Sequence, residues 1–265
     1  MKSTRLPKLR LVFLCFFALF VVIPIIYTLV NAFSGGTAYG LIPREWSLGG
    51  WYEVFIRRPH YLIKFWNSLL LSGATVAGQT LISCLAGYGF SKFRFPGREG
   101  FFFLVIIVMM MPYQVTLVSN YFVIRGLGLL GNWAALIIPA VFSPFGVFLL
   151  RQVFDTCPDE LLDAARIDGA GELKILFRIL VPRSRSGVIS LIILTFIDAW
   201  NMVEQPVVYL DSPYDYPLSV FLSQMRGQDV GTLCVCGILA ALPVLLLFLY
   251  YDNDLADGIS LSQIH

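Results

Sequence analysis

The sequence predicts an all-α integral membrane protein with six transmembrane helices and a cytoplasmic helical loop between the fourth and the fifth. Three observations predict this fold class: the composition, the length of the charge-poor runs and the distribution of basic residues. Of the 265 residues, 57% are hydrophobic and only 14% are charged, with a mean hydropathy of +0.76. In soluble domains about a quarter of the residues are charged, so this composition excludes an ordinary soluble domain.

Charge-poor runs of sufficient length mark the expected spans. A hydrocarbon core about 30 Å thick needs roughly 20 apolar residues of helix. Six such runs are present, at about 11–33, 65–90, 101–124, 132–150, 187–208 and 230–251. Several contain proline, which membrane helices tolerate where neighbouring groups satisfy the freed backbone. We therefore expect a single transmembrane domain over residues 1–265.

Lysine and arginine are distributed unequally between the two sides of this topology. With the N-terminus inside, thirteen of the 19 lie in inner segments and six in outer segments. Cytoplasmic connections carry such an excess, so both termini are expected in the cytoplasm. The first run exceeds the apolar core of a signal peptide and no A-x-A site follows it, which favours an uncleaved first helix.

The longest inner connection, about 151–186, is amphipathic and is expected to form two short helices. Acidic residues at Asp159 and Glu160 follow Pro158 and predict a helix start, and Gly169 is placed for a turn with positive φ. The second helix, ending near Pro182, is expected to present one apolar stripe. The stripe consists of Leu173, Leu176, Phe177 and Leu180. Such a loop can lie on the membrane surface or dock into a groove of a soluble partner, and periodicity does not separate the two.

The stretch from Asp163 to Pro182, DAARIDGAGELKILFRILVP, resembles the EAA loop of permease subunits of binding-protein-dependent ABC importers. The EAA pattern is E-A-A, three residues, Gly, nine residues and I-x-L-P. This chain has the matching residues Ala164, Ala165, Gly169, Ile179 and Pro182 at that spacing. Asp163 replaces Glu, and Val181 replaces Leu.

Further stretches resemble the carbohydrate branch of these importers, the family of the inner partner in maltose-type permease pairs. They are Asn67-Ser68, Gly87 to Phe90, Phe95 to Gly97, Arg166 to Ala170, Phe177 to Pro182 and Trp200-Asn201. After Tyr251 the resemblance is weak. The likeness implies a multi-pass subunit of the bacterial cell membrane that imports a sugar or a related solute.

The resemblance also implies partners. A second, similar permease would pair with this chain, two ATP-binding subunits would dock on the two EAA loops, and an extracytoplasmic solute-binding protein would deliver the solute. Closure of the ATPase dimer would then tilt the membrane helices through the coupling loop. The coupling residues implied are Asp163, Ala164, Ala165, Asp168, Gly169, Ile179 and Pro182. ATP and Mg would be bound by the ATPase subunits, and no nucleic acid is expected as a partner.

No motif for catalysis or for a cofactor accompanies these features. The sequence has no G-x-x-x-x-G-K-[ST], HExxH or GxSxG pattern. The five cysteines lie mostly in apolar runs, and neither His60 nor His265 has a ligand cluster nearby in the sequence. We expect a non-catalytic chain that binds neither a cofactor nor a metal.

Polar residues in the fifth run are candidates for the solute path. Asp198, Asn201, Glu204 and Gln205 fall at i, i+3, i+6 and i+7 of a helix. A carboxylate facing lipid costs at least about 2.5 kcal/mol, so this stripe is expected to face the bundle interior, a partner or water. It can form a hydrogen-bond network between helices, or it can line the path with Trp200 adding an apolar face.

Two other classes of protein compete with the importer permease. An ion-coupled secondary transporter ordinarily needs internal repeats and midplane ion sites within one chain. A membrane-embedded enzyme could use Asp198 and Glu204 as a catalytic acid pair. The sequence offers no second motif for either.

Overall fold

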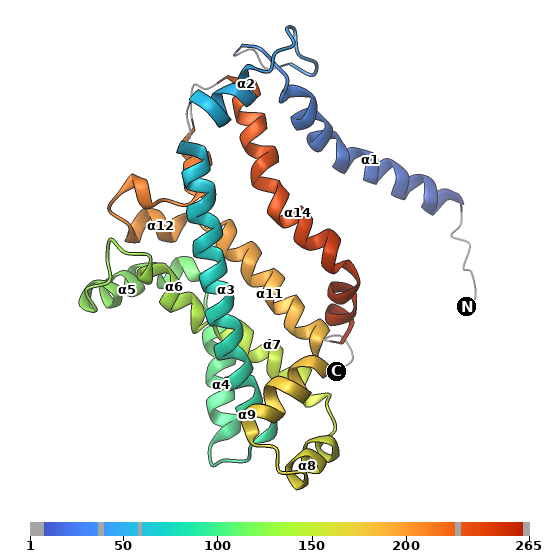
Figure 1. Cartoon of the computed structure of the whole chain (residues 1–265), viewed down its shortest axis with the longest axis vertical. Helices are drawn as coiled ribbons and strands as arrows, with labels where there is room; N and C mark the ends of the chain where they lie inside the picture. The colour runs from blue at the N-terminus through green and yellow to red at the C-terminus, as the bar shows by residue number, and fades with distance from the viewer. Residues whose placement is uncertain (1–7, 37–39, 58–59, 226–228, 262–265) are drawn as a thin grey trace. The chain divides into compact units, whose positions relative to one another are not determined.

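The computed structural model describes residues 8–36, 40–57, 60–225 and 229–261, and these residues are almost entirely helical (Figure 1). In the described part the only β pairing is an isolated antiparallel bridge between Ser34 and Trp46. The longer helices are α1 (Lys8–Asn31), α3 (His60–Lys92), α4 (Arg98–Met109), α5 (Tyr113–Gly126), α6 (Ala134–Val141), α7 (Pro144–Asp155), α8 (Asp159–Ile167), α11 (Arg185–Trp200) and α14 (Val230–Leu261). The shorter elements are α2 (Gly49–Tyr52), η1 (Glu53–Arg57), α9 (Glu172–Ile175), η2 (Leu176–Leu180), α10 (Val181–Arg183), α12 (Glu204–Tyr209), η3 (Pro213–Asp215) and α13 (Leu218–Gln224).

Four stretches of the described chain are long and apolar enough to cross a membrane, judged by length and composition. They are Val12–Asn31, His60–Lys92, Ala134–Asp155 and Val230–Asp252. Two further helix pairs pass the same test only when taken together. The pair α4 and α5 is bent by 105°, and Glu172–Arg183 followed by α11 is bent by 86°. The number of spans is therefore four, or up to six if each bent pair is one span.

Two of the runs predicted as continuous helices, 101–124 and 187–208, are interrupted, and a third, 132–150, is interrupted at Phe142 and Ser143 between α6 and α7. The first breaks between Met109 and Tyr113, because Pro112 has no N–H to donate and is itself extended, with φ −60° and ψ 131°. Proline also disfavours helical backbone angles at the residue before it. The second ends at Trp200, and a new helix begins at Glu204. Pro206 fits the first turn of that new helix, where its missing N–H is no loss.

The chain divides into two compact units. Unit 1 comprises residues 1–63 and 224–243, and unit 2 comprises 64–223 and 244–265. In unit 1, Gly50 and Gly231 bring backbones into close contact, since a Cβ on Gly50 would lie 2.7 Å from the Gly231 carbonyl carbon. Tyr61 donates a hydrogen bond of 3.1 Å to the Cys236 carbonyl oxygen. Side chains of α1 such as Phe16, 70% exposed, form an apolar surface suited to lipid.

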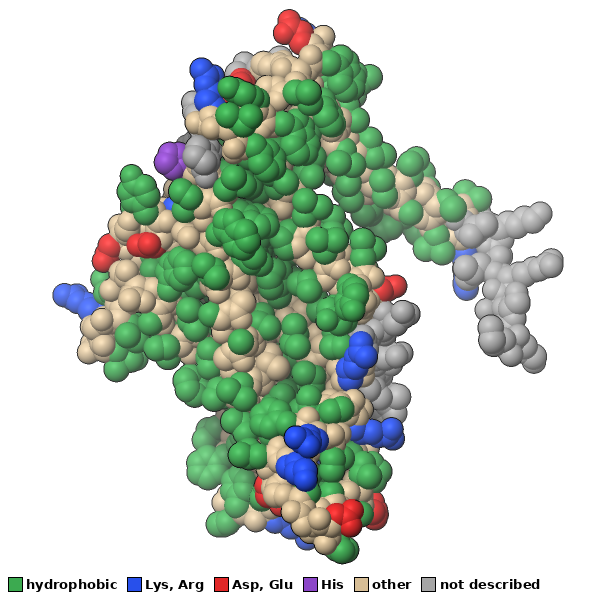
Figure 2. Space-filling view, in the orientation of Figure 1, with side chains coloured by type: hydrophobic (Ala, Val, Ile, Leu, Met, Phe, Trp, Pro, Cys, Tyr) green, Lys and Arg blue, Asp and Glu red, His purple; other side chains and the backbone are tan. Residues whose placement is uncertain are grey.

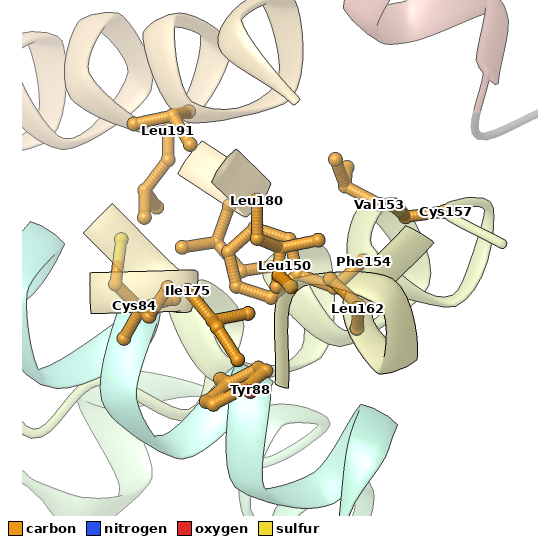
Figure 3. Packing of buried hydrophobic residues seen from close by; sticks show 13 residues of the cluster. Cys84, Tyr88, Leu150, Val153, Phe154, Cys157, Leu162, Ile175, Leu180 and Leu191 are labelled. Atoms are coloured by element: carbon orange, nitrogen blue, oxygen red, sulfur yellow. The ribbon is translucent and has the colours of Figure 1, made fainter. Parts of the chain in front are cut away.

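Unit 2 has a core that joins α3, α7 and the loop predicted to be amphipathic. The residues of this core point toward one another in Figure 3. Leu150 and Phe154 of α7, Leu162 of α8, and Ile175 and Leu180 are at most 1% exposed. The loop is therefore fixed at its base by apolar packing, which supplies most of the stabilisation of a short helix.

The predicted apolar stripe of the second short helix is wrong in part. Leu176 and Leu180 are fully buried, but Leu173 and Phe177 are 64% and 43% exposed. The buried side chains are Ile175, Leu176 and Leu180, in a segment that includes the π-helical turn η2. Pro182 favours such a turn because it cannot donate a hydrogen bond to the Arg178 carbonyl oxygen.

Helices α3 and α7 approach each other closely through small residues. A Cβ on Gly146 would lie 2.1 Å from Ser83 Oγ, and one on Gly87 would lie 3.0 Å from Leu150 Cβ. Small residues allow this approach between membrane helices. It places the polar face of α3 against the segment that contains Gly146.

Candidate transport site: a cavity and a helical hairpin

Three interrupted helices of unit 2 meet at one cavity of about 930 Å³. The interruptions are those between α4 and α5, between α6 and α7, and between α11 and α12. Residues beside each of them line the cavity: Met109, Met111, Tyr113, Phe142, Ser143, Pro144, Asn201, Met202 and Val203. Irregular backbone at membrane depth is tolerated where it lines a water-filled cavity. The volume lies in the range of small-molecule sites.

The lining combines apolar surface with hydroxyl, amide and carboxylate groups. The polar residues are Thr75, Gln79, Tyr113, Thr116, Asn120, Ser143, Thr195, Asp198, Asn201, Glu204, Gln205 and Tyr209. None of the lining residues in the described chain is Lys, Arg or His. The cavity thus offers many hydrogen-bonding groups, and its only formal charges are negative.

Some of the polar side chains are held in place by one another. The hydroxyl groups of Tyr113 and Tyr209 lie 2.8 Å apart, and Thr116 Oγ1 donates to the Tyr113 carbonyl oxygen at 3.0 Å. Asn201 Nδ2 donates to the Ile197 carbonyl oxygen at 2.9 Å and closes the end of α11. These bonds orient part of the wall before any solute enters.

Two other hydroxyls of the wall lack partners. Thr75 and Thr195 are 2% and 4% exposed, and neither hydroxyl oxygen has a hydrogen-bond partner within the described residues. A buried polar group left unpaired costs about 1–3 kcal/mol.

At the opposite end of α3, a hairpin is formed by α8, the turn at Gly169 and α9. Gly169 has φ +80°, as predicted, and a Cβ there would meet nothing within 4 Å. The turn is closed by Ala170 N–H, which donates to the Ala165 carbonyl oxygen at 3.0 Å. A left-handed residue after the helix end is the usual way to end a helix in a tight turn.

Ion pairs hold the hairpin together and attach it to α3. Arg166 contacts Asp163 at 2.7 Å and Glu172 at 2.9 Å, and Glu172 also accepts a hydrogen bond from the Tyr88 hydroxyl of α3. The two carboxylates raise the pKa of the Arg166 guanidinium above its ordinary value. These contacts fix the angle between α8 and α9.

A second ion pair holds the start of α8. Lys92, at the end of α3, contacts Asp159 at 2.7 Å and donates to the Cys157 carbonyl oxygen at 2.6 Å. The Lys92 ammonium holds the pKa of the Asp159 carboxyl below its ordinary range. Charged side chains gather over the α8 and α9 end of unit 2 in Figure 2, whereas the flanks of its apolar helices are largely hydrophobic.

Residues 79–253 match the family model of the binding-protein-dependent transport system inner membrane component. The chain belongs to this family of ABC transporter permeases. The matched region includes α7, the hairpin, α11 and most of the cavity wall. A permease of this family is a non-catalytic membrane subunit, and the ATPase is a separate chain.

Curated relatives support the same assignment. The permease is 31% identical over 225 residues to the arabinooligosaccharides transport system permease protein AraQ of Bacillus subtilis (strain 168), covering 84% of this chain and 80% of that protein. It is 32% identical over 197 residues to the lactose transport system permease protein LacG of Rhizobium radiobacter, covering 73% and 72%. It is 39% identical over 142 residues to the sn-glycerol-3-phosphate transport system permease protein UgpE of Yersinia pestis bv. Antiqua (strain Antiqua), covering 54% and 50%.

Solved structures show the same fold. A chain of a bacterial ABC transporter involved in the import of the acidic polysaccharide alginate matches with a TM-score of 0.84 at 22% identity, over 93% of this permease and 95% of that chain. A chain of the MetNI methionine ABC transporter in inward-facing conformations matches with a TM-score of 0.56 at 17% identity, over 73% and 93%. The helical membrane fold predicted from the sequence is thereby confirmed.

The structure places the predicted path residues of the permease in two groups. Asp198, Asn201, Glu204 and Gln205 all line the cavity, but they do not share one helix as expected, because α11 ends at Trp200. Trp200 lies outside the lining. It is 4% exposed, stacks on Phe196 at 5.4 Å and meets Phe65 edge-on at 5.5 Å.

The predicted coupling residues of the permease also divide into two groups. Asp163, Ala164, Asp168 and Gly169 are exposed on the hairpin, beside Ile167, which is 87% exposed. Ala165 and Ile179 pack on the core, and Pro182 lies in α10 next to the bend before α11. One set is thus available at the surface, and the other attaches the hairpin to the membrane helices.

Thr75 and Gln79 in the cavity wall of the permease were not predicted as site residues. A signal for them exists in the sequence, because polar residues recur on one face of the apolar run of α3. They are Ser68, Ser72, Thr75, Gln79 and Ser83, each at most 5% exposed. Tyr113 and Ser143 have no such signal, since they reach the cavity only through the breaks between helices.

Proposed function

We propose that this permease is the transmembrane subunit of an importer that moves a carbohydrate into the cell, driven by ATP hydrolysis in a separate subunit. The observation that carries the proposal is the polar cavity at the three helix breaks. Discontinuous helices mark the substrate sites of many transporters, because freed backbone groups can face water or solute there.

The lining suits a carbohydrate by its chemistry. Sugar hydroxyls both donate and accept hydrogen bonds, and the wall supplies hydroxyl, amide and carboxylate groups that complement both roles. Two relatives are named for arabinooligosaccharides and for lactose. Other similar proteins are named for sn-glycerol-3-phosphate and for alginate, so family membership leaves the charge of the solute open.

The hairpin is proposed as the docking element for an ATP-binding subunit. It combines an exposed surface, with Ile167 and Asp163, and a base packed on α3 and α7. A helix that is exposed at one end and anchored at the other can transmit a displacement to the membrane helices. The complete transporter would contain a second permease, two ATP-binding subunits and an extracytoplasmic solute-binding protein, with ATP and Mg on the ATPase subunits.

The orientation follows from the same charges. The proposal places the hairpin and both termini in the cytoplasm, where lysine and arginine are in excess. Gly171 suits a labelling test, because φ there is −72° and a Cβ would meet nothing within 4 Å. With Cys15 replaced, Gly171→Cys should react with an impermeant thiol reagent only after the cytoplasmic face is opened. Labelling from the outside of intact cells would contradict both the orientation and the docking role.

The decisive experiment is uptake by the complete complex in proteoliposomes. We expect entry of radiolabelled sugars from a panel to require ATP together with the solute-binding protein. Uptake driven by an ion gradient without ATP would instead support a secondary transporter. Chemical conversion of the sugar by the complex would support a membrane-embedded enzyme.

A further inference from the structure

We propose that the cavity of this permease selects its solute by charge: Asp198 and Glu204 exclude anions, so that the solute carried is an uncharged, polyhydroxylated molecule. The inference rests on the proposed function for the statement that the solute is a carbohydrate. It adds the charge class, which family membership leaves open.

The formal charges of the wall have one sign. Asp198 and Glu204 are exposed and line the cavity, and neither forms an ion pair with a residue that the structure describes. No lining residue of the described chain carries a positive charge. Like charges in a cleft with low-dielectric walls repel an entering anion, because such walls focus the field.

Helix ends do not reverse this sign. Each end carries a partial charge of about half a unit, positive at the N-terminus and negative at the C-terminus. Each of the three breaks brings one end of each kind to the cavity: α4 with α5, α6 with α7, and α11 with α12. Their contributions largely cancel, so the two carboxylates set the sign of the charge that this chain brings to the cavity.

The hydrogen-bonding groups of the wall point independently to an uncharged ligand with hydroxyl groups. Ser143, Asn201 and Gln205 line the cavity with hydroxyl and amide groups. These groups can both donate and accept hydrogen bonds, as a sugar hydroxyl does. Carboxylates accept only, so Asp198 and Glu204 match the donors of a sugar and find none on a phosphate or a carboxylate.

The potential in the cavity can be measured without knowing the solute. We would prepare the complete complex with Cys15, which is exposed, replaced by alanine, and with Ser143→Cys in the lining; the other four cysteines are buried. Two methanethiosulfonates of similar size report the charge, one with a trimethylammonium group and one with a sulfonate. The quantity compared is the reaction rate of the cationic reagent divided by that of the anionic reagent. We expect this ratio to be about tenfold higher in the complex than for a free thiol in solution.

The same ratio is then measured in the double variant Asp198→Asn/Glu204→Gln. Asp252→Asn serves as the control, because Asp252 is an exposed acidic residue outside the lining. The ratio should fall several-fold in the first variant and stay unchanged in the second. An equal ratio in all three proteins would overturn the inference. If the double variant does not assemble, Asp198→Asn alone carries the comparison.

Solute binding completes the test. The neutral oligosaccharide taken up in the uptake assay is compared with the same oligosaccharide oxidised at C6 of its terminal unit to a uronic acid. We expect the neutral form to bind about tenfold more tightly at low ionic strength, with the difference reduced by salt and by the double substitution. Equal binding of both forms to the unsubstituted complex would overturn charge exclusion. A charge-dependent thiol ratio without uptake of any carbohydrate would overturn only the carbohydrate part of the proposed function.

Discussion

The hairpin and the cavity, both in unit 2, differ in whether their polar side chains are paired with one another. In the hairpin, Arg166 pairs with Asp163 and Glu172, and Glu172 is also bonded to α3. In the cavity, Asp198 forms no ion pair with a described residue and Thr75 has no hydrogen-bond partner there. Paired groups make an element that moves as one body, and the unpaired carboxylate of Asp198 leaves hydrogen-bond acceptors for a passing solute.

The strength of the individual interactions has a different consequence in each region. A hydrogen bond to a charged group contributes about 1.5–3 kcal/mol when shielded, but Arg166 and Glu172 are 36% and 43% exposed, so solvent screening reduces each pair to about 1 kcal/mol or less. The hairpin therefore relies on several weak contacts and on its buried leucines. The cavity must hold its solute weakly enough to release it.

The largest effect is expected where the hairpin depends on backbone geometry. Gly169→Val should abolish ATP-driven uptake while the protein still inserts and assembles, because a β-branched residue at φ +80° costs about 1–3 kcal/mol. Stimulation of ATP hydrolysis by loaded binding protein should be lost as well. Proteoliposome uptake and ATPase assays measure both.

Gly171 provides the matched control for Gly169. Gly171→Ala should leave uptake unchanged, because its φ of −72° suits any residue and a Cβ there meets nothing within 4 Å. Gly169→Asn should lie between the two, since asparagine tolerates left-handed backbone better than valine. Normal uptake in Gly169→Val would show that the turn is not part of the coupling element.

A smaller effect is expected in the cavity. Asn201→Ala should lower sugar uptake several-fold or change which sugar is carried, while the amount of assembled complex stays the same. The amide lines the cavity, and within the described residues its Nδ2 donates to the Ile197 carbonyl oxygen at the end of α11. Loss of that hydrogen bond costs about 1 kcal/mol. Uptake is divided by the amount of complex recovered from the membrane.

The opposite pattern would change the role of these residues. If Asn201→Ala and Asp198→Asn reduce the assembled complex and leave uptake per complex unchanged, the polar groups stabilise packing. The solute path would then have to be sought on other helices.

Sequence patterns predicted the hairpin better than the cavity. The hairpin is encoded locally: Asp159 and Glu160 start α8, and Gly169 forms the turn, all within a short stretch. The cavity is assembled from residues far apart, such as Thr75, Tyr113 and Ser143, at helix breaks that a hydropathy run does not show. Hydropathy averages over about 20 residues, so an interruption of two or three residues disappears in it.

Trp200 illustrates the same difference at a single residue. Its neighbours Asp198 and Asn201 line the cavity, but its own ring is buried against Phe65 and Phe196. Sequence distance predicts which residues share a helix face only while the helix continues. The end of α11 at Trp200 breaks that rule for the residues that follow.

The bond between the hairpin and α3 should contribute a modest and measurable amount. In a double-mutant cycle, Tyr88→Phe and Glu172→Gln should each destabilise the permease by about 0.5–1.5 kcal/mol, with less than additive loss in the pair. Tyr88→Phe keeps the ring in the core and removes only the hydroxyl. Thermal unfolding of the purified complex measures all four proteins. Additive losses would show that the two side chains act independently.

The smallest effect concerns pH and the pair between Lys92 and Asp159. The ammonium holds the pKa of the Asp159 carboxyl below its ordinary range, so the stabilisation is fully present above the unfolded pKa of about 3.9 and is lost as the pH falls through the lower folded value. Because the Asp159 side chain is 72% exposed, the contribution is below about 1 kcal/mol. Asp159→Asn should therefore lower the melting temperature slightly at pH 5 and 7, and this difference should shrink as the pH falls below about 3.9.

Glu160→Gln is the control for the pH experiment, because it removes a carboxylate from the same first turn of α8 without touching Lys92. Any loss common to both variants reports the interaction of a carboxylate with the helix N-terminus, and only the excess in Asp159→Asn reports the ion pair. An excess that does not shrink as the pH is lowered below about 3.9 would show that hydrogen bonding or packing of the side chain, rather than its charge, holds the start of the hairpin on α3.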